Sequence, residues 1–155
     1  GTLVHGAIDW PTRSWNMRRH SAEHLLTGLI EAQGEPPKIF SDLEKLEYQP
    51  SSLTAEQIPA VGRRFDEIVN EDAPVHVYFE DRAKIDASGD PRKISFLQKI
   101  PRSVDRLRIV DIGTYASTFC FGTHVKNTRE IGHLAELRLE DAKKGKKIVH
   151  FKLKP

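Results

Sequence analysis

The first clear pattern in the chain is a run of apolar residues at helical spacing. No proline interrupts residues 16–33, and apolar side chains recur there every three or four positions. These positions are Ala22, Leu25, Leu26, Leu29 and Ile30. Gly34 follows directly and is a typical helix stop. We therefore expect a helix over residues 16–33.

A second apolar stripe follows at the same spacing. Thr54 and Gln57 have the spacing of a capping box, in which each side chain accepts from a backbone N–H of the helix start. The stripe consists of Ile58, Val61, Phe65, Ile68 and Val69. The pattern predicts a second helix over residues 54–71, with Pro59 in its first turn.

Most of the remaining apolar residues alternate with polar ones, which is typical of strands. Residues 39–40 and 43–48 fit two short strands or an irregular hairpin, and 81–103 fit a helical turn, a loop and a surface excursion. Further strands are expected at 75–79, 107–113 and 115–125, the last with a turn, and residues 134–141 and 148–153 are expected to form a hairpin. This order predicts an α+β fold, with helices packed on a mainly antiparallel sheet in two layers.

The start of the chain has a different pattern. Residues 1–14 hold a short apolar stretch and the pair Trp10-Pro11, which favours an extended segment ending at the proline. The residues that follow, 15–155, are expected to form one domain.

Composition narrows the class of protein. The chain has 155 residues, 24 basic and 22 acidic side chains, and a single cysteine. It lacks the long apolar run of a membrane span and the start of a signal peptide, so we expect a cytoplasmic protein. A lone cysteine excludes an internal disulfide, which leaves Cys120 as a core thiol, a reactive thiol or a metal ligand. The near-neutral charge means that a nucleic-acid partner would depend on local basic patches.

Two pairs of side chains could hold a metal ion. His20 and His24 lie one turn apart on the same face of the first predicted helix. Far along the chain, Cys120 and His124 flank a glycine that lets the backbone fold around an ion. Three imidazoles and one thiolate suit zinc better than magnesium or calcium. The sequence therefore predicts a zinc site that only the complete fold can assemble.

Other uses of these residues stay open. Zinc held by all four ligands could be purely structural, whereas a catalytic site keeps one position for water or substrate. The segment 20–24 also fits the HxxEH pattern of some metalloproteases, but these need a further carboxylate ligand. Cys120 could instead be a nucleophile with a histidine as its base.

The motifs together resemble a known family. The segment 18–26 (RRHSAEHLL), the segment 120–125 (CFGTHV) and the following Glu130-Ile131-Gly132 resemble the alanyl-tRNA editing proteins called AlaX, which are related to the editing domain of alanyl-tRNA synthetase. Gly6 to Trp10 and Arg13 also look like the family's approach to its HxxxH helix. The resemblance implies an editing-domain-like fold and an enzyme that hydrolyses mischarged alanine tRNA in trans, mainly seryl-tRNA and in some members glycyl-tRNA. It also implies that His20, His24, Cys120 and His124 bind zinc.

The resemblance has limits. Larger members carry an upstream β-rich domain, and residues 1–14 are expected to be its remnant, ahead of an editing domain at 15–155. Residues 38–48 lack the arginine-phenylalanine strand signature of the synthetase-embedded domain. Two rival functions remain: a non-catalytic, zinc-stapled tRNA-binding module, and a zinc hydrolase of another small ester.

Further residues are candidates for catalysis or RNA binding. Glu23 could orient a ligand or act on water, or be an ordinary solvated helix position, and Thr123 could hydrogen-bond the substrate or stabilise a turn. Ser21 and Thr27 are weaker candidates for pocket hydroxyls. Basic side chains that could contact the phosphates of tRNA are Arg18, Arg19, Lys126, Arg129, Lys143, Lys144, Lys146 and Lys147.

Overall fold

The computed structural model describes residues 1–89, 97–98 and 100–155. Its first helix, α1, spans Trp10–Glu31 and so begins earlier than the sequence pattern indicates. Asp9 caps it by accepting from the Thr12 N–H and, at 2.7 Å, from the Thr12 hydroxyl. Pro11 does not end an extended segment, because the first turn of a helix needs no N–H donor there. The assignment of residues 1–14 to an upstream domain stays a prediction.

The second helix, α2, spans Ile58–Glu71 and begins later than expected. Only half of the predicted capping box forms: the Thr54 N–H donates to Gln57 Oε1 at 2.8 Å, while Gln57 itself is the N-cap residue. Pro59 lies in the first turn, as predicted. The buried residues of α2 are those of the predicted apolar stripe.

A four-stranded antiparallel sheet joins the middle of the chain to its C-terminal hairpin. Its strands are β1 (Phe40–Ser41), β2 (Lys45–Tyr48), β6 (Leu134–Ala142) and β7 (Lys146–Leu153), in the order β1-β2-β7-β6. The predicted hairpin of 134–141 and 148–153 is thus confirmed. A short 3-10 helix, η2 (Lys143–Gly145), forms its turn.

A separate three-stranded antiparallel sheet contains β3 (Val75–Asp81), β4 (Arg106–Ile112) and β5 (Ala116–Phe119), in that order. The short helix α3 (Arg82–Ala87) follows β3 and is the predicted helical turn. Most of the predicted loop and surface excursion at 90–99 lies outside the described residues. The expected strand at 115–125 ends at Phe119 and a turn follows, before the 3-10 helix η1 (Thr128–Ile131).

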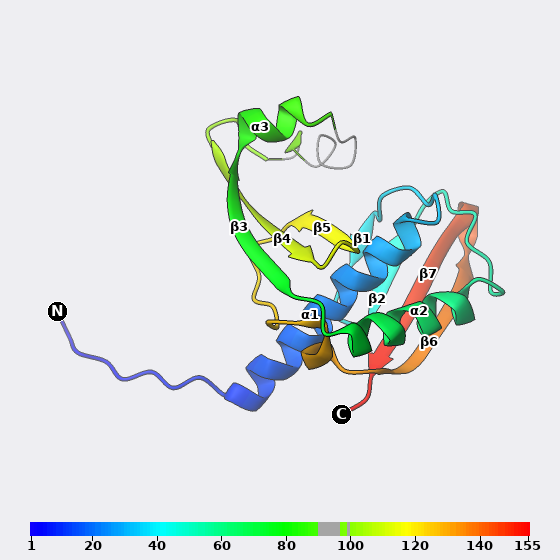
Figure 1. The fold of residues 1–155 in the computed structure, drawn as a ribbon, viewed down its shortest axis with the longest axis horizontal. Coiled ribbons are helices and arrows are strands. Elements are labelled where there is room, and N and C mark those ends of the chain that lie inside the picture. The colour runs from blue at the N-terminus through cyan, green and yellow to red at the C-terminus, as the bar shows by residue number, and fades with distance from the viewer. Residues whose placement is uncertain (90–96, 99) are drawn as a thin grey trace.

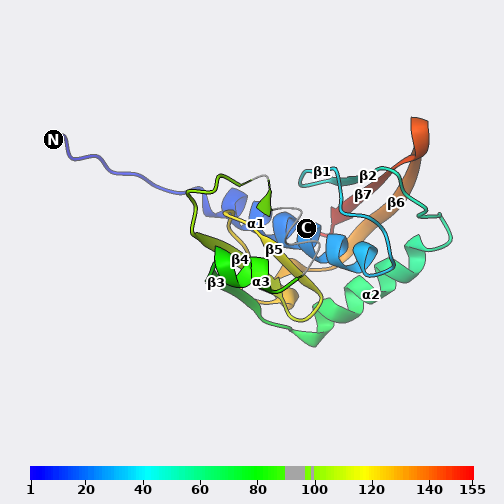
Figure 2. The ribbon, with the colours of Figure 1, turned by 90° about the horizontal axis from the view of Figure 1, so that it is seen from above.

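The first helix lies between the two sheets (Figures 1 and 2). Helices α1 and α2 and the four-stranded sheet enclose the main core, and a second, smaller core lies between the three-stranded sheet and α3. The α+β class and the antiparallel pairing are confirmed, although the strands form two sheets where the pattern suggested one. No described helix is long and apolar enough to cross a membrane.

Candidate metal centre

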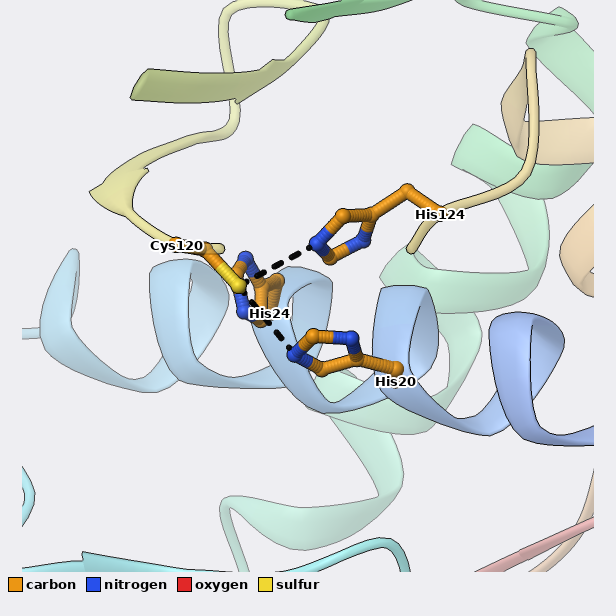
Figure 3. A group of neighbouring side chains, drawn as sticks. All are labelled: His20, His24, Cys120 and His124. Atoms are coloured by element: carbon orange, nitrogen blue, oxygen red, sulfur yellow. Dashed lines mark hydrogen bonds between the residues drawn. The ribbon is translucent and has the colours of Figure 1, made fainter. Parts of the chain in front are cut away.

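The four predicted metal ligands lie together where α1 meets the loop after β5. His20 and His24 extend from successive turns of α1, and Cys120 and His124 extend from the loop toward them (Figure 3). Their possible ligand atoms all lie within 4.8 Å of one another. Cys120 Sγ is 3.4 Å from both His20 Nε2 and His124 Nε2. Residues separated by most of the chain thus form one compact cluster.

The loop that carries Cys120 is packed tightly against α1. A Cβ atom at Gly122 would lie 2.3 Å from Cε1 of His20, so a larger residue would force the ring or the loop to move. The Gly122 N–H donates to Cys120 Sγ at 3.3 Å. Arg108, on β4, donates from Nη1 to the carbonyls of Cys120 and, at 3.0 Å, of Gly122. These contacts hold the thiol at the histidines.

Two of the imidazole rings are held by their Nδ1 atoms. His20 Nδ1 lies 3.2 Å from the Thr123 carbonyl, to which it can only donate. His124 Nδ1 lies 3.1 Å from Ser21 Oγ, which is fully buried. Because His20 Nδ1 donates, its Nε2 has a free lone pair that faces the cysteine sulfur, as in a metal-binding histidine, and His124 Nε2 faces the same sulfur.

The second ring nitrogen of His24 gives independent support for a metal site. His24 Nδ1 is buried and has no hydrogen-bond partner among the described residues. Its Nε2 lies 3.5 Å from Glu23 Oε2. Because a buried polar atom without a partner is costly, the free Nδ1 fits a site that binds an ion. The residues present therefore fit zinc, in donor type and in arrangement.

Burial controls the protonation of three members of the cluster, namely His24, His124 and Cys120. It lowers the pKa of His24 well below its usual range, with the neighbouring His20 adding to the effect, and it lowers the pKa of His124 to about 3. Both rings are therefore neutral at physiological pH, which is the form that binds metals. Burial also raises the pKa of the Cys120 thiol, while the Gly122 N–H and Arg108 act in the opposite direction.

Glu23 is not a solvated helix position. Its side chain is only 5% exposed and forms an ion pair with Lys38 Nζ. The Thr27 hydroxyl lies 3.2 Å from both Glu23 Oε1 and Lys38 Nζ. Sequence reasoning missed Lys38, which the chain brings back to α1 from the loop before β1. Arg108 was also missed, because a charged residue within a predicted strand gives no sign of what it contacts.

Of the hydroxyl candidates, Thr123 is exposed beside the cluster, as expected for a residue that contacts substrate. The other two have partners within the protein: Ser21 Oγ contacts His124 Nδ1, and the Thr27 hydroxyl contacts Glu23.

The side chains of Arg18 and Arg19 already have hydrogen-bond partners within the protein. Arg18 donates to the carbonyls of Ile131 (3.0 Å) and Lys154 (2.7 Å). Arg19 donates to the Leu43 carbonyl and pairs with Glu44. Their guanidinium groups therefore hold α1 to its neighbours, which leaves fewer donors for phosphates.

The remaining basic candidates are more accessible. Lys126 is exposed, and Arg129 is 69% exposed and contacts Asp72 at 3.7 Å. At the hairpin tip, Lys146 pairs with Glu47 and Lys147 with Asp141, while Lys143 and Lys144 are exposed and form no ion pair within the described residues. This hairpin tip lies away from the end of β5, which Cys120 directly follows (Figures 1 and 2).

Comparison with known proteins gives consistent matches. Residues 107–149 match the family described as "Threonyl and Alanyl tRNA synthetase second additional domain". The alanyl-tRNA editing protein AlaX-M of Methanosarcina barkeri is 26% identical over 99% of this chain and 64% of its own length. AlaX-L of Pyrococcus horikoshii is 29% identical over 89% of this chain and 34% of its own length. The alanine–tRNA ligase of Ignicoccus hospitalis is 31% identical over 97% of this chain and 17% of its own length. The chain thus spans about two thirds of the AlaX-M relative and smaller shares of the others.

Proposed function

We propose that this chain, a homologue of the alanyl-tRNA editing proteins of the AlaX type, is a zinc-dependent deacylase that acts in trans on mischarged alanine tRNA. Seryl-tRNA is the first expected substrate and glycyl-tRNA the second. The observation that carries this proposal is the cluster of His20, His24, Cys120 and His124, with ligand atoms within 4.8 Å of one another. Residues 15–155 form the proposed editing domain.

The cluster has a closed side and an open side. His24 and His124 are buried, whereas His20 and Cys120 are partly exposed. Zinc held there would supply a Lewis acid that polarises an ester carbonyl or a water molecule. The aminoacyl ester would therefore approach over His20 and Cys120, where the loop 120–124 meets solvent.

Neighbouring side chains have distinct proposed roles. Glu23 orients His24, because its carboxylate is held by Lys38 and Thr27 and faces the ring at 3.5 Å. Thr123 lies on the open side and can offer its hydroxyl to the substrate amine or hydroxyl. Selection of serine over alanine would then depend on a polar group that pairs with the serine hydroxyl and stays unpaired beside a methyl group.

Contacts to tRNA are proposed for two surfaces. Lys126 and Arg129 follow His124 closely in the chain and are exposed, so they suit the phosphates of the acceptor end. Lys143 and Lys144 at the hairpin tip suit a more distant part of the tRNA. Arg18, Arg19, Lys146 and Lys147 contribute less, since each already has a partner within the protein.

The test is deacylation of seryl-tRNA for alanine, measured after chelation and again after zinc is restored, beside correctly charged alanyl-tRNA. We expect zinc-dependent loss of serine, alanine spared, and no turnover by His20→Ala or Cys120→Ala. Tight tRNA binding without turnover by zinc-loaded protein would favour the non-catalytic binding module. A third outcome would favour a hydrolase of another small ester. The chain would then hydrolyse small esters but not mischarged tRNA, and the double variant Lys143→Ala and Lys144→Ala would have wild-type activity.

A further inference from the structure

A large, exposed aromatic side chain directly follows one of the candidate metal ligands in the chain. Phe121 is 72% exposed, although it follows Cys120 and precedes the closely packed Gly122. Among the exposed large apolar residues in the described part of the chain, it is the one that adjoins a candidate ligand in sequence. An exposed phenylalanine at a reaction site is a candidate for substrate contact.

The backbone on both sides of Phe121 is held in place. Arg108 donates to the carbonyls of the residue before it and the residue after it. The Cys120 N–H donates to the Arg108 carbonyl at 3.2 Å, which continues the pairing of β4 with β5 by one residue. The ring is therefore presented from a fixed backbone, which reduces the entropy lost when a ligand contacts it.

Basic residues near this loop also suit RNA. Arg108 contacts the backbone on both sides of Phe121, and the exposed Lys126 follows the loop in sequence. Flat aromatic rings beside basic groups bind unpaired nucleotides by stacking on their bases, while the cations attract the phosphates. In an aminoacyl-tRNA, the scissile ester is attached to the ribose of the unpaired 3′-terminal nucleotide, so the base of that nucleotide must lie close to the metal centre.

We propose that Phe121 is the platform on which the 3′-terminal nucleobase of the RNA substrate stacks. The inference rests on the proposed function, because it takes the ester to lie at the metal centre. Stacking one residue away from Cys120 would place the ribose and its ester over the open side of the cluster. Since every base has an aromatic face, this contact would position the RNA end without reading its sequence.

The experiment measures binding, so it does not depend on catalysis. Zinc-loaded full chain is titrated with two fluorescent hairpin RNAs that carry a single-stranded 3′ end, identical except that one has an abasic terminal nucleotide. Phe121→Ala should weaken binding of the intact RNA at least about fivefold. The same variant should change binding of the abasic RNA little, and Phe121→Trp should retain tight binding of the intact RNA.

The matched control is Tyr78→Ala. Tyr78 is a partly exposed aromatic residue that pairs across the sheet with Ile109, in the row that also contains Phe119. Tyr78 lies on β3, which β4 separates from β5 and from the loop that carries Cys120 and Phe121. Tyr78→Ala should therefore leave binding of both RNAs unchanged.

Other outcomes overturn the proposal. Equal losses for the intact and abasic RNAs would mean that Phe121 does not contact the terminal base. Unchanged RNA binding combined with a lower sedimentation coefficient for Phe121→Ala would make the ring a contact between copies of this chain. Failure of the deacylase function would show instead as absent hydrolysis by a wild-type chain that still distinguishes the two RNAs.

Discussion

Glu23 places a buried negative charge beside a candidate metal ligand, and Lys38 is its partner. We predict that Lys38→Met weakens zinc binding about 10- to 100-fold, because the carboxylate loses the cation that holds it against His24. Competition with a chromogenic chelator measures the affinity. Lys38→Arg should recover part of the loss, since it keeps the charge.

Lys45→Met is the matched control for this prediction. Lys45 also pairs with a glutamate, Glu47, at 3.0 Å, but it lies on β2 within the four-stranded sheet. Its removal should leave zinc affinity unchanged. Equal zinc affinity in Lys38→Met and wild type would show that Glu23 does not act on His24.

Gly122 sets how closely the cysteine loop approaches α1. We predict that Gly122→Ala weakens zinc binding about 10-fold or more, because the new methyl group would occupy the position of the His20 ring, 2.3 Å from Cε1. Isothermal titration with zinc gives the affinity and the number of ions bound.

Gly62→Ala is the corresponding control within α2. A Cβ atom there would make an ordinary 3.6 Å contact with Leu137, and alanine favours a helix over glycine by about 1 kcal/mol. The Gly62→Ala variant should bind zinc with wild-type affinity and have a slightly higher melting temperature. Normal zinc binding by Gly122→Ala would mean that the loop can move away without disturbing the ligands.

The cluster of candidate metal ligands could be predicted from sequence, whereas the residues that support this cluster could not. His20 and His24 are linked by helical periodicity, and Cys120 and His124 by a short motif, so residue type and spacing suffice. Lys38 and Arg108 act through contacts between elements remote in sequence, namely α1 with the loop before β1 and β4 with the loop after β5. No local pattern encodes such contacts.

At the scale of elements, Arg108 connects β4 to the loop that carries Cys120. We predict that Arg108→Met lowers both the melting temperature and zinc affinity, because two carbonyls lose a charged donor worth about 1.5–3 kcal/mol. Backbone amides of residues 120–122 should exchange hydrogen faster, as measured by mass spectrometry. Arg108→Lys should restore part of the protection.

Arg106→Met tests whether any arginine of β4 has this effect. Arg106 is 68% exposed and, among the described residues, makes a 3.7 Å contact with Asp81 and a cation-π contact with Phe79. Its replacement should change stability by no more than about 0.5 kcal/mol. Equal hydrogen exchange at residues 120–122 in Arg108→Met and Arg106→Met would show that Arg108 does not hold the cysteine loop in place.

Element types were easier to predict than element ends. The stripes of α1 and α2 and the alternation of β6 and β7 were recognisable because burial follows the helix or strand period. The start of α1 was not, since Trp10-Pro11 reads as a break unless Asp9 is known to cap the helix. The split into two sheets depends on pairing partners, such as β2 with β7, that lie far apart in the sequence.

For the whole molecule, the proposed zinc ion links α1 to the loop after β5 and thus to the three-stranded sheet. An ion that binds only the folded chain stabilises it by mass action, by about 4 kcal/mol when free zinc exceeds the dissociation constant about 1,000-fold. For a domain of this size, that corresponds to a rise in melting temperature of about 8–16 °C. We therefore predict that a chelator lowers the melting temperature and that zinc restores it.

The controls for this prediction separate the specific site from general salt effects. Magnesium should not restore the melting temperature, since thiolate and imidazole ligands suit zinc better. Cys120→Ala should melt at a temperature much less sensitive to zinc, because it keeps the three histidines but loses the thiolate ligand. If zinc raised the melting temperature of wild type and Cys120→Ala equally, the ion would be acting elsewhere, and α1 and the three-stranded sheet would be held together by packing alone.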